Sequence, residues 1–250
     1  TWLNVYTTIL RYYCVIINIT MRQFIYILTI LFSLSISAQE GFWYDVLLEV
    51  EGEDTNEFEK TVDKFYSSLD FPDDVALGFS RIQIKGQGFE ETHILSFLSP
   101  SSESLANFLS TLSGSEWENY VEKVRPFIDN VRRSAGIVTK AYNQENVGPI
   151  GQAWLFKVKS KDAPAFYEEY TKVMEVIDFP GFSGTGQITH GVSDGESHFI
   201  YATYDDLNSA FTFGPKNDLE AKAFADFFKA TAEFAEFSQS FTRVLIKEYN

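Results

Sequence analysis

The sequence predicts an α+β fold in which two β-α-β-β-α-β units follow one another in a single chain. The first observation is a repeated ending: "GIVTKAYN" finishes at Asn143, and "RVLIKEYN" finishes at Asn250, the last of 250 residues. The second is a repeated Asp-Phe-Pro, at 70–72 and again at 178–180. Because the two echoes occur in the same order and at nearly the same spacing, they indicate an internal repeat, which can decide a whole fold.

Two more anchors extend the match. His93 aligns with His198 in "ETHILSF" and "ESHFIYA", and Tyr44 aligns with Trp154 at the start of each copy. The resulting division is a first repeat at 42–143, a linker at 144–150 and a second repeat at 151–250.

Each copy shows the same succession of patterns. Apolar and polar residues alternate at 43–51 and 153–159, which predicts a strand, and apolar residues at helical spacing follow. The proline of each Asp-Phe-Pro ends that helix. Further strands are predicted at 78–86 and 91–98 in the first copy, and at 184–191 and 196–204 in the second. The second pair contains Asp194-Gly195, which predicts a two-residue hairpin turn.

The remainder of each copy predicts a long helical region and a closing strand. The helical regions are 102–133, interrupted near Gly114, and 206–238, interrupted near Gly214. The closing strands are 136–142 and 241–249.

This element order is that of the ferredoxin-like unit, whose sheet is covered by helices on one face only. Because a bare apolar face must be buried, two such units are expected to pack sheet to sheet as a pseudo-twofold α+β barrel. In element order and repetition, though in no specific motif, the chain resembles the dimeric α+β barrel superfamily, here with both halves in one chain. The resemblance implies two enzyme alternatives, since the superfamily includes cofactor-independent monooxygenases and some haem proteins share the fold.

The N-terminal region resembles an export signal. From Met21 the sequence has one positive charge, an apolar run and small residues ending at Ala38, which predicts a signal peptide cleaved after that residue. An uncleaved anchor is the alternative. Residues 1–20 are interpreted as upstream sequence, so 1–38 is set aside and a periplasmic or secreted protein, with no membrane attachment after cleavage, is expected.

Composition excludes several classes of function. The only cysteine, Cys14, precedes the predicted cleavage site, so a mature chain would have no disulfide, zinc–thiolate site or cysteine nucleophile. The net charge of −15 disfavours nucleic acid and anionic membranes as partners.

The strand face that helices leave uncovered is expected to line the interior of the barrel. In the first strand Asp45, Leu47 and Glu49 lie on that face. The candidate ligand-binding residues of the lumen are Glu49, Lys140, Tyr142, Lys157, Phe199, Tyr201, Lys247 and Tyr249. The alternative is that the charged members form salt bridges or reach solvent.

Three histidines are weak candidates for a metal site. A two-residue turn at 194–195 would place His190 and His198 on opposite faces of the hairpin. His93 and His198 are each followed two residues on by an apolar side chain, which favours a structural position beneath a helix. No metal or cofactor is therefore predicted, and haem stays the alternative that the resemblance implies.

The sequence favours non-catalytic binding of a small molecule in or near the lumen. It lacks P-loop and H-E-x-x-H motifs, and an enzyme of the α+β barrel type is the alternative. A further alternative is a self-associating protein that uses the phenylalanine-rich segment 221–237. We expect a monomer with an internal pseudo-dimer, and further homo-oligomers remain compatible with it.

Overall fold

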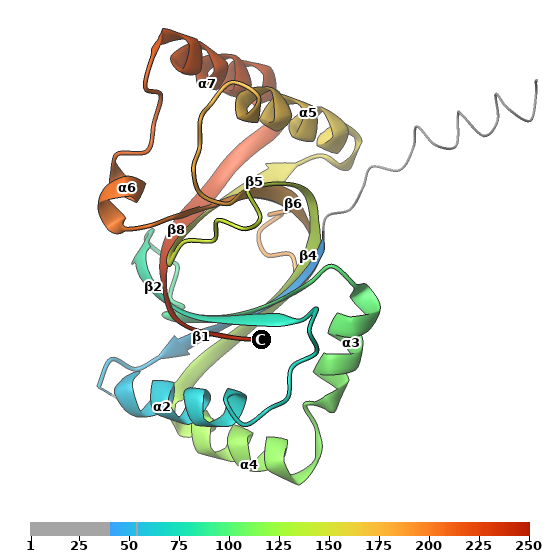
Figure 1. Cartoon of the computed structure of the whole chain (residues 1–250), viewed down its shortest axis with the longest axis vertical. Helices are drawn as coiled ribbons and strands as arrows, with labels where there is room; N and C mark the ends of the chain where they lie inside the picture. The colour runs from blue at the N-terminus through green and yellow to red at the C-terminus, as the bar shows by residue number, and fades with distance from the viewer. Residues whose placement is uncertain (1–40, 54) are drawn as a thin grey trace, which may run out of the picture. The chain divides into compact units, whose positions relative to one another are not determined.

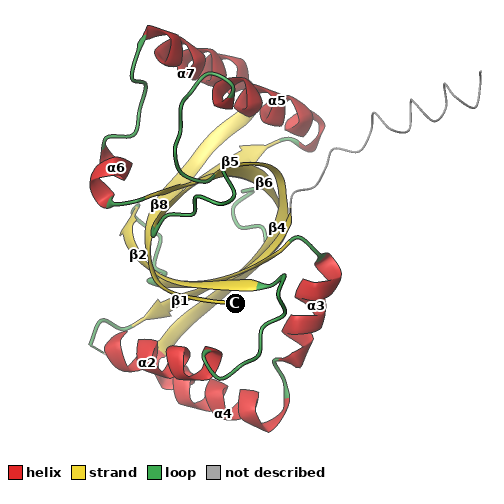
Figure 2. Cartoon of the chain, in the orientation of Figure 1, coloured by secondary structure: helices red, strands yellow, loops and turns green. Residues whose placement is uncertain are grey.

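Eight antiparallel strands close into a barrel, and helices cover its outer face (Figures 1 and 2). This is a computed structural model that describes residues 41–53 and 55–250. The predicted signal peptide and upstream segment therefore lie outside the described residues. Within the described part, no helix is long and apolar enough to cross a membrane.

Both halves have the order strand, helix, two strands, helices, strand. The first contains β1 (Gly41–Val50), α2 (Thr55–Tyr66), β2 (Ala76–Lys85), β3 (His93–Ser99), α3 (Ser102–Thr111), α4 (Gly114–Val124) and β4 (Ile128–Tyr142). The second contains β5 (Ile150–Val158), α5 (Ala163–Met174), β6 (Ser183–His190), β7 (His198–Tyr204), α6 (Leu207–Phe211), α7 (Asp218–Thr231) and β8 (Ala235–Tyr249).

The two halves join through their sheet edges. Around the barrel the strands run β4-β1-β3-β2 and then β8-β5-β7-β6, so β2 pairs with β8 and β6 returns to β4. Leu77 pairs with Tyr249 at one seam, and Ser183 pairs with Tyr142 at the other. Edge pairing satisfies backbone groups that two stacked open sheets would leave unpaired. The predicted α+β barrel is therefore present, and pairing between the sheet edges of the two halves closes it.

Each seam contains an irregularity at the same place. The pairing of β8 with β2 skips Ile246, and the pairing of β4 with β6 skips Thr139. An extra residue in a strand reverses the face to which every following side chain points. Lys247 and Tyr249 therefore leave the inner face that Arg243 occupies.

Apolar side chains fill both faces of the sheet. Beneath the helices, α2 buries Phe58 and Val62 in the first half, and α5 buries Phe166 and Val173 in the second. The inner face has its own cluster, which consists of Leu47, Ile82, Phe89, Ile94, Ala153 and Phe241.

The last helix and strand of each half differ from the predicted bounds. The closing strands begin at Ile128 and Ala235, earlier than the predicted 136 and 241, because these residues pair with β1 and β5. The phenylalanine-rich helix correspondingly ends at Thr231. Phe237 lies on β8, so the predicted helical region that ends at 238 is shorter than expected, although Phe228 of α7 is exposed.

The hairpin of the second half also differs from the prediction. Asp194 and Gly195 have the positive φ angles of a tight turn, 50° and 81°. The ladder between β6 and β7, however, ends at the pair Gln187 and His198, because β6 continues along β4 as far as His190. The two-residue hairpin register was therefore wrong.

The alignment of the first strands is corrected by two residues. Leu48 pairs with His93, and Phe156 pairs with His198. Leu48 thus corresponds to Phe156, and the position that corresponds to Tyr44 is Gln152 instead of Trp154.

Candidate functional site

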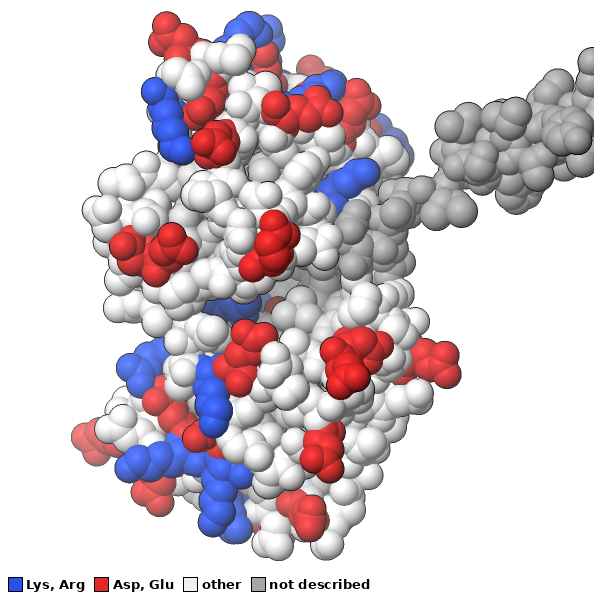
Figure 3. Space-filling model, viewed as in Figure 1, with Lys and Arg blue, Asp and Glu red and all other residues white. Residues whose placement is uncertain are grey.

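A cavity of about 240 Å³ lies inside the barrel. Figure 3 shows a hollow in the middle of the face that is turned toward the viewer. Most of its wall is apolar. The apolar side chains that line it are Trp43, Leu47, Ile94, Leu98, Val138, Val147, Ala153, Leu155, Phe182, Ile188, Phe199 and Phe241. An apolar cavity with a few convergent polar groups is the usual form of a small-molecule site.

Arg243 is the centre of the polar groups in this cavity. Its Nε donates a hydrogen bond to Tyr201 Oη (2.9 Å), and its Nη1 donates one to Ser96 Oγ (2.7 Å). The guanidinium carbon also lies 4.9 Å from the centre of the Tyr201 ring. Burial lowers the pKa of Arg243, but Tyr201 and Asp45 outweigh that effect and raise it above its ordinary value. The guanidinium is thus a fixed, permanent cation.

Asp45 is the acidic partner in the cavity. It pairs with Ser96 across β1 and β3, and its side chain lines the cavity with Arg243. Burial raises the pKa of Asp45 to about 6, and Arg243 and a hydrogen bond with Ser96 only partly offset that effect. A carboxyl group with this pKa exchanges protons near neutral pH, which general acid–base catalysis requires.

A glycine makes room for this cluster. A Cβ at Gly151 would lie 1.9 Å from Tyr201 Oη and 3.0 Å from Arg243 Nε. The absent side chain of Gly151 therefore lets the phenol and the guanidinium meet.

Charged groups gather where the cavity meets the β6–β7 loop. Arg132 forms an ion pair with Glu91 (Nε–Oε1 2.8 Å) and lies 5.1 Å from the centre of the Phe89 ring. Glu196 is buried and accepts hydrogen bonds from Ser238 Oγ (2.8 Å) and Gln239 Nε2 (2.6 Å).

Two of the eight predicted lumen residues line the cavity, namely Phe199 and Tyr201. The other six are not among the lining residues; they are Glu49, Lys140, Tyr142, Lys157, Lys247 and Tyr249.

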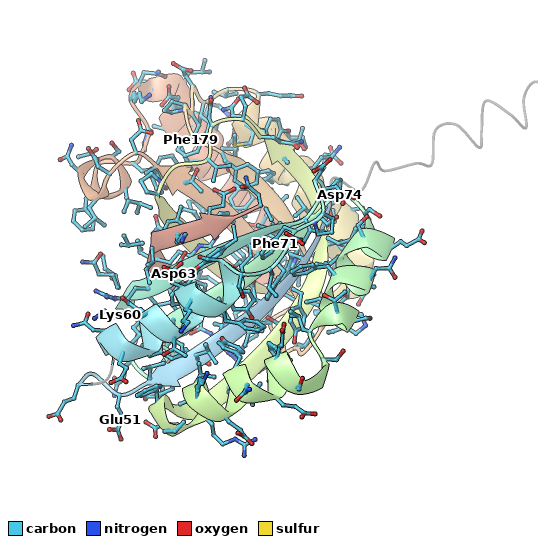
Figure 4. The ribbon with its side chains drawn as sticks, turned by 60° about the horizontal axis from the view of Figure 1, so that its bottom comes forward. Glu51, Lys60, Asp63, Phe71, Asp74 and Phe179 are labelled. Carbon is cyan, nitrogen blue, oxygen red and sulfur yellow. The ribbon has the colours of Figure 1, made fainter. Side chains whose placement is uncertain are left out.

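The irregular seams explain four of these six positions. Without the extra residue in β8, Lys247 and Tyr249 would point to the inner face, as Arg243 does. Without the extra residue in β4, Lys140 and Tyr142 would also point to the inner face. Instead, Lys247 Nζ and Tyr249 Oη donate to the Asp63 carboxylate on α2, at 2.6 and 3.1 Å. Figure 4 labels Asp63 on this helix.

Tyr142 packs against the core beneath the second-half helices. Glu49 and Lys157 lie near the ends of their strands, and Lys157 forms an ion pair with Glu236 there (3.5 Å).

The histidines lie away from the cavity. His93 is buried against Phe58 with its Nε2 3.0 Å from Glu59 Oε1, whereas His198 is buried beneath α5. Both occupy the predicted structural positions, and His190 is exposed. Among residues 41–53 and 55–250, no group of three or more His, Cys, Asp or Glu could hold a metal ion. Because no histidine lines the cavity, its residues do not fit a haem held by histidine.

Sequence reasoning placed Asp45 on the inner face and named Tyr201 as a candidate, but it missed Arg243 and Ser96 and gave Asp45 no role in binding. Arg243 is the single charge within the apolar run "FTRVLI", and Asp45 is the single charge within "FWYDVLL". A lone charge on the inner face of an apolar strand indicates a buried polar group, so these two positions could have been found from the sequence. The contact between Arg243 and Ser96, which are far apart in sequence, gave no local signal.

The chain matches no protein-family model and no curated protein sequence. Solved structures do match. A candidate monooxygenase from Lactobacillus acidophilus has a TM-score of 0.59 at 12% identity, covering 85% of this chain and 97% of that one. One from Fusobacterium nucleatum has a TM-score of 0.60 at 12% identity, covering 85% and 95%. An anthrone oxidase-like protein has a TM-score of 0.59 at 10% identity, covering 85% and 94%.

The chain therefore has an α+β barrel fold similar to that of these proteins. At these identities the likeness concerns the fold, and it covers most of each chain compared.

Proposed function

We propose that the barrel binds a small, largely apolar molecule with a weakly acidic C–H or O–H group, and that Asp45 removes that proton. The observation that carries the proposal is the Asp45 carboxyl, with a pKa of about 6, in one apolar cavity with the fixed cation Arg243. A base is useful near neutral pH only when its pKa lies close to that pH.

Arg243 stabilises the anion that deprotonation creates. Its guanidinium is held by Tyr201 and Ser96 before any ligand arrives, so little reorganisation accompanies the reaction. A preorganised cation in a water-poor site is among the strongest means of stabilising developing negative charge.

The fold relatives support an oxygen-dependent continuation, because their descriptions include monooxygenase and anthrone oxidase-like proteins. The overall change would convert one methylene group and one molecule of dioxygen into one carbonyl group and one molecule of water. Asp45 takes one proton, and the carbanion gives its electron pair to dioxygen to form a C–O bond. The resulting peroxide takes the proton back from Asp45. Loss of the second C–H proton and cleavage of the O–O bond then release water and leave the carbonyl.

Oxygen uptake with anthrone as the probe tests this function. We expect kcat/KM to fall by about 100-fold or more in Asp45→Asn, since that substitution removes the base. Asp129→Asn, at an exposed position on β4, is the matched control and should keep wild-type activity. The wild-type rate should fall as the pH drops below about 6, because protonated Asp45 cannot accept a proton.

Non-catalytic binding is the second candidate, and the predominantly apolar wall of the cavity favours it. Saturable binding of anthrone without oxygen uptake, unaffected by Asp45→Asn, would select this candidate. Absence of both binding and oxygen uptake would reject both functions.

We also infer that the two halves are copies of one ferredoxin-like unit. Two observations support this inference. Leu48 pairs with His93 in the first half as Phe156 pairs with His198 in the second. The pairing also skips one residue at the corresponding position of each seam, Thr139 on β4 and Ile246 on β8. We also propose that the protein acts outside the cytoplasm, because residues Met21 to Ala38 have the sequence pattern of a signal peptide.

A further inference from the structure

The cavity reaches both ends of the barrel, and the two ends differ in chemistry. One, the near end, is where β4 finishes and β5 begins, and it contributes Val147 and Leu98 to the wall. The other, the far end, lies at the β6–β7 loop and contributes Gly191, Ser193 and Glu196.

The far end presents charge and tightly packed side chains. Glu196 and Glu91 are both buried there and engaged by Gln239 and Arg132. Phe89 is also buried, with its ring 5.1 Å from that of Phe241. An apolar molecule that entered here would have to displace water and partners from charged groups, which is unfavourable.

The near end presents apolar side chains to solvent. Val147 is 61% exposed and Leu98 41% exposed, yet both line the cavity. An apolar side chain that is exposed and also faces an internal cavity marks a mouth through which an apolar molecule can pass.

The connection that carries Val147 is held in place on both sides. Gly148 N donates to Thr203 Oγ1 (3.0 Å), and Leu245 N donates to Pro149 O (2.8 Å). Asn146 Nδ2 donates to Pro180 O (3.1 Å). The segment 143–149 therefore does more than link the two halves, since it crosses one end of the barrel (Figure 1) and fixes Val147 at the cavity.

We propose that the ligand enters through the near end and that Val147 sets the width of molecule admitted. This inference rests on the proposed function of the lumen and adds a residue that determines specificity. Enlarging the Val147 side chain narrows the mouth and leaves the Asp45–Arg243 cluster untouched. Enlarging an exposed side chain at the far end leaves entry unchanged.

Stopped-flow binding of 2-naphthol tests the proposal, with quenching of tryptophan fluorescence as the signal because Trp43 lines the cavity. The test variant is Val147→Phe. The matched control is Val192→Phe, a valine that is 50% exposed on the β6–β7 loop and does not line the cavity. We expect the association rate to fall about tenfold in Val147→Phe and to stay within about twofold of wild type in Val192→Phe. Phenol, which is narrower, should be slowed less than 2-naphthol.

Three other results would overturn the proposal. Equal rates in wild type and Val147→Phe would reject the near-end mouth while the lumen function stands. Slowing in Val192→Phe alone would move the entrance to the far end. No saturable binding of either probe to the wild type would reject the lumen function and, with it, the mouth. Unchanged thermal unfolding of both variants, expected at such exposed positions, confirms that the rates report entry.

Discussion

The pairs β1–β4 and β5–β8 occupy corresponding places in the barrel, yet they place bulk in opposite strands. In the first pair Trp43 of β1 faces Gly136 of β4, and in the second Gly151 of β5 faces Arg243 of β8. In each case the glycine accommodates the large neighbour: a Cβ at Gly136 would lie 2.7 Å from the Trp43 ring. The same backbone thus holds an apolar ring in one half and the cation of the site in the other.

The difference extends to the rest of the cluster. By strand register Asp45 corresponds to Ala153, and Ser96 corresponds to Tyr201. The position related to the site therefore has neither a base nor a cation. The two halves share one order of elements but only one of them carries Arg243, so backbone geometry alone does not create the polar centre. The polar centre depends on which strand carries the large residue.

The largest expected effect comes from filling the two glycine positions. Gly136→Ala should lower the free energy of unfolding by at least about 3 kcal/mol, because its Cβ would lie 1.9 Å from the rigid backbone oxygen of Gln187. Gly151→Ala should lower it less, because its Cβ meets the movable tip of Tyr201. Urea unfolding measures both, and equal losses would show that the two halves tolerate bulk alike.

A second contrast concerns His93 and His198, which occupy corresponding positions in the two halves. Glu59 stands beside His93, whereas the corresponding residue beside His198 is Tyr167, and His198 Nε2 has no hydrogen-bond partner among the described residues. Burial lowers the pKa of both, that of His198 to about 4 from an ordinary 6.5, and the hydrogen bond to Glu59 partly counteracts the effect at His93.

Acid should therefore destabilise the second half through His198. A folded-state pKa below the unfolded value contributes stability that is present above pH 6.5 and is lost as the pH falls through 4. Between pH 7 and 4.5 the wild type should lose about 2 to 3 kcal/mol through this group. His198→Phe should abolish that loss in urea titrations at the two pH values. A wild-type stability that is independent of pH over this window would contradict the buried neutral state.

The smallest of these effects concerns Asp45, whose raised pKa has the opposite sign. A carboxyl group whose folded-state pKa lies above its unfolded value favours the folded state at low pH, and that contribution is lost as the pH rises from about 4 through 6. Asp45→Asn should therefore be more stable than wild type at pH 8 by about 2 kcal/mol. Thermal or urea unfolding at pH 4 should show the two proteins converging. A variant that is less stable than wild type at pH 8 would contradict this expectation. It would indicate that the attraction between the Asp45 carboxylate and Arg243 exceeds the cost of burying the carboxylate.

Local patterns in the sequence predicted the succession of elements and part of the inner face. The alternation around Asp45 and Leu47 placed both on the inner face, where the structure has them. Each helix ends six residues before the proline of its Asp-Phe-Pro segment, at Tyr66 and Met174, so these segments follow the helices without ending them. Figure 4 labels Phe71 and Phe179 of the two segments.

What the sequence did not predict depends on contacts between distant strands. The skipped residues Thr139 and Ile246 arise only when the two sheets meet at their edges, so no local pattern shows that Tyr142 and Tyr249 turn outward. The same holds for the polar centre, since Arg243 reaches Ser96 only once the barrel closes.

The connection at 143–149 also divides the residues of the site between the two halves of the chain. Asp45 and Ser96 come from residues before the connection at 143–149, and Tyr201 and Arg243 come from residues after it. Cleavage within that connection would give two fragments, one with the base and one with the cation. Under the proposed function, neither fragment alone would act on a ligand, and mixing the fragments would restore the site only where the strands pair again. The barrel could therefore serve as a split protein in which the site forms only when the two fragments reassemble.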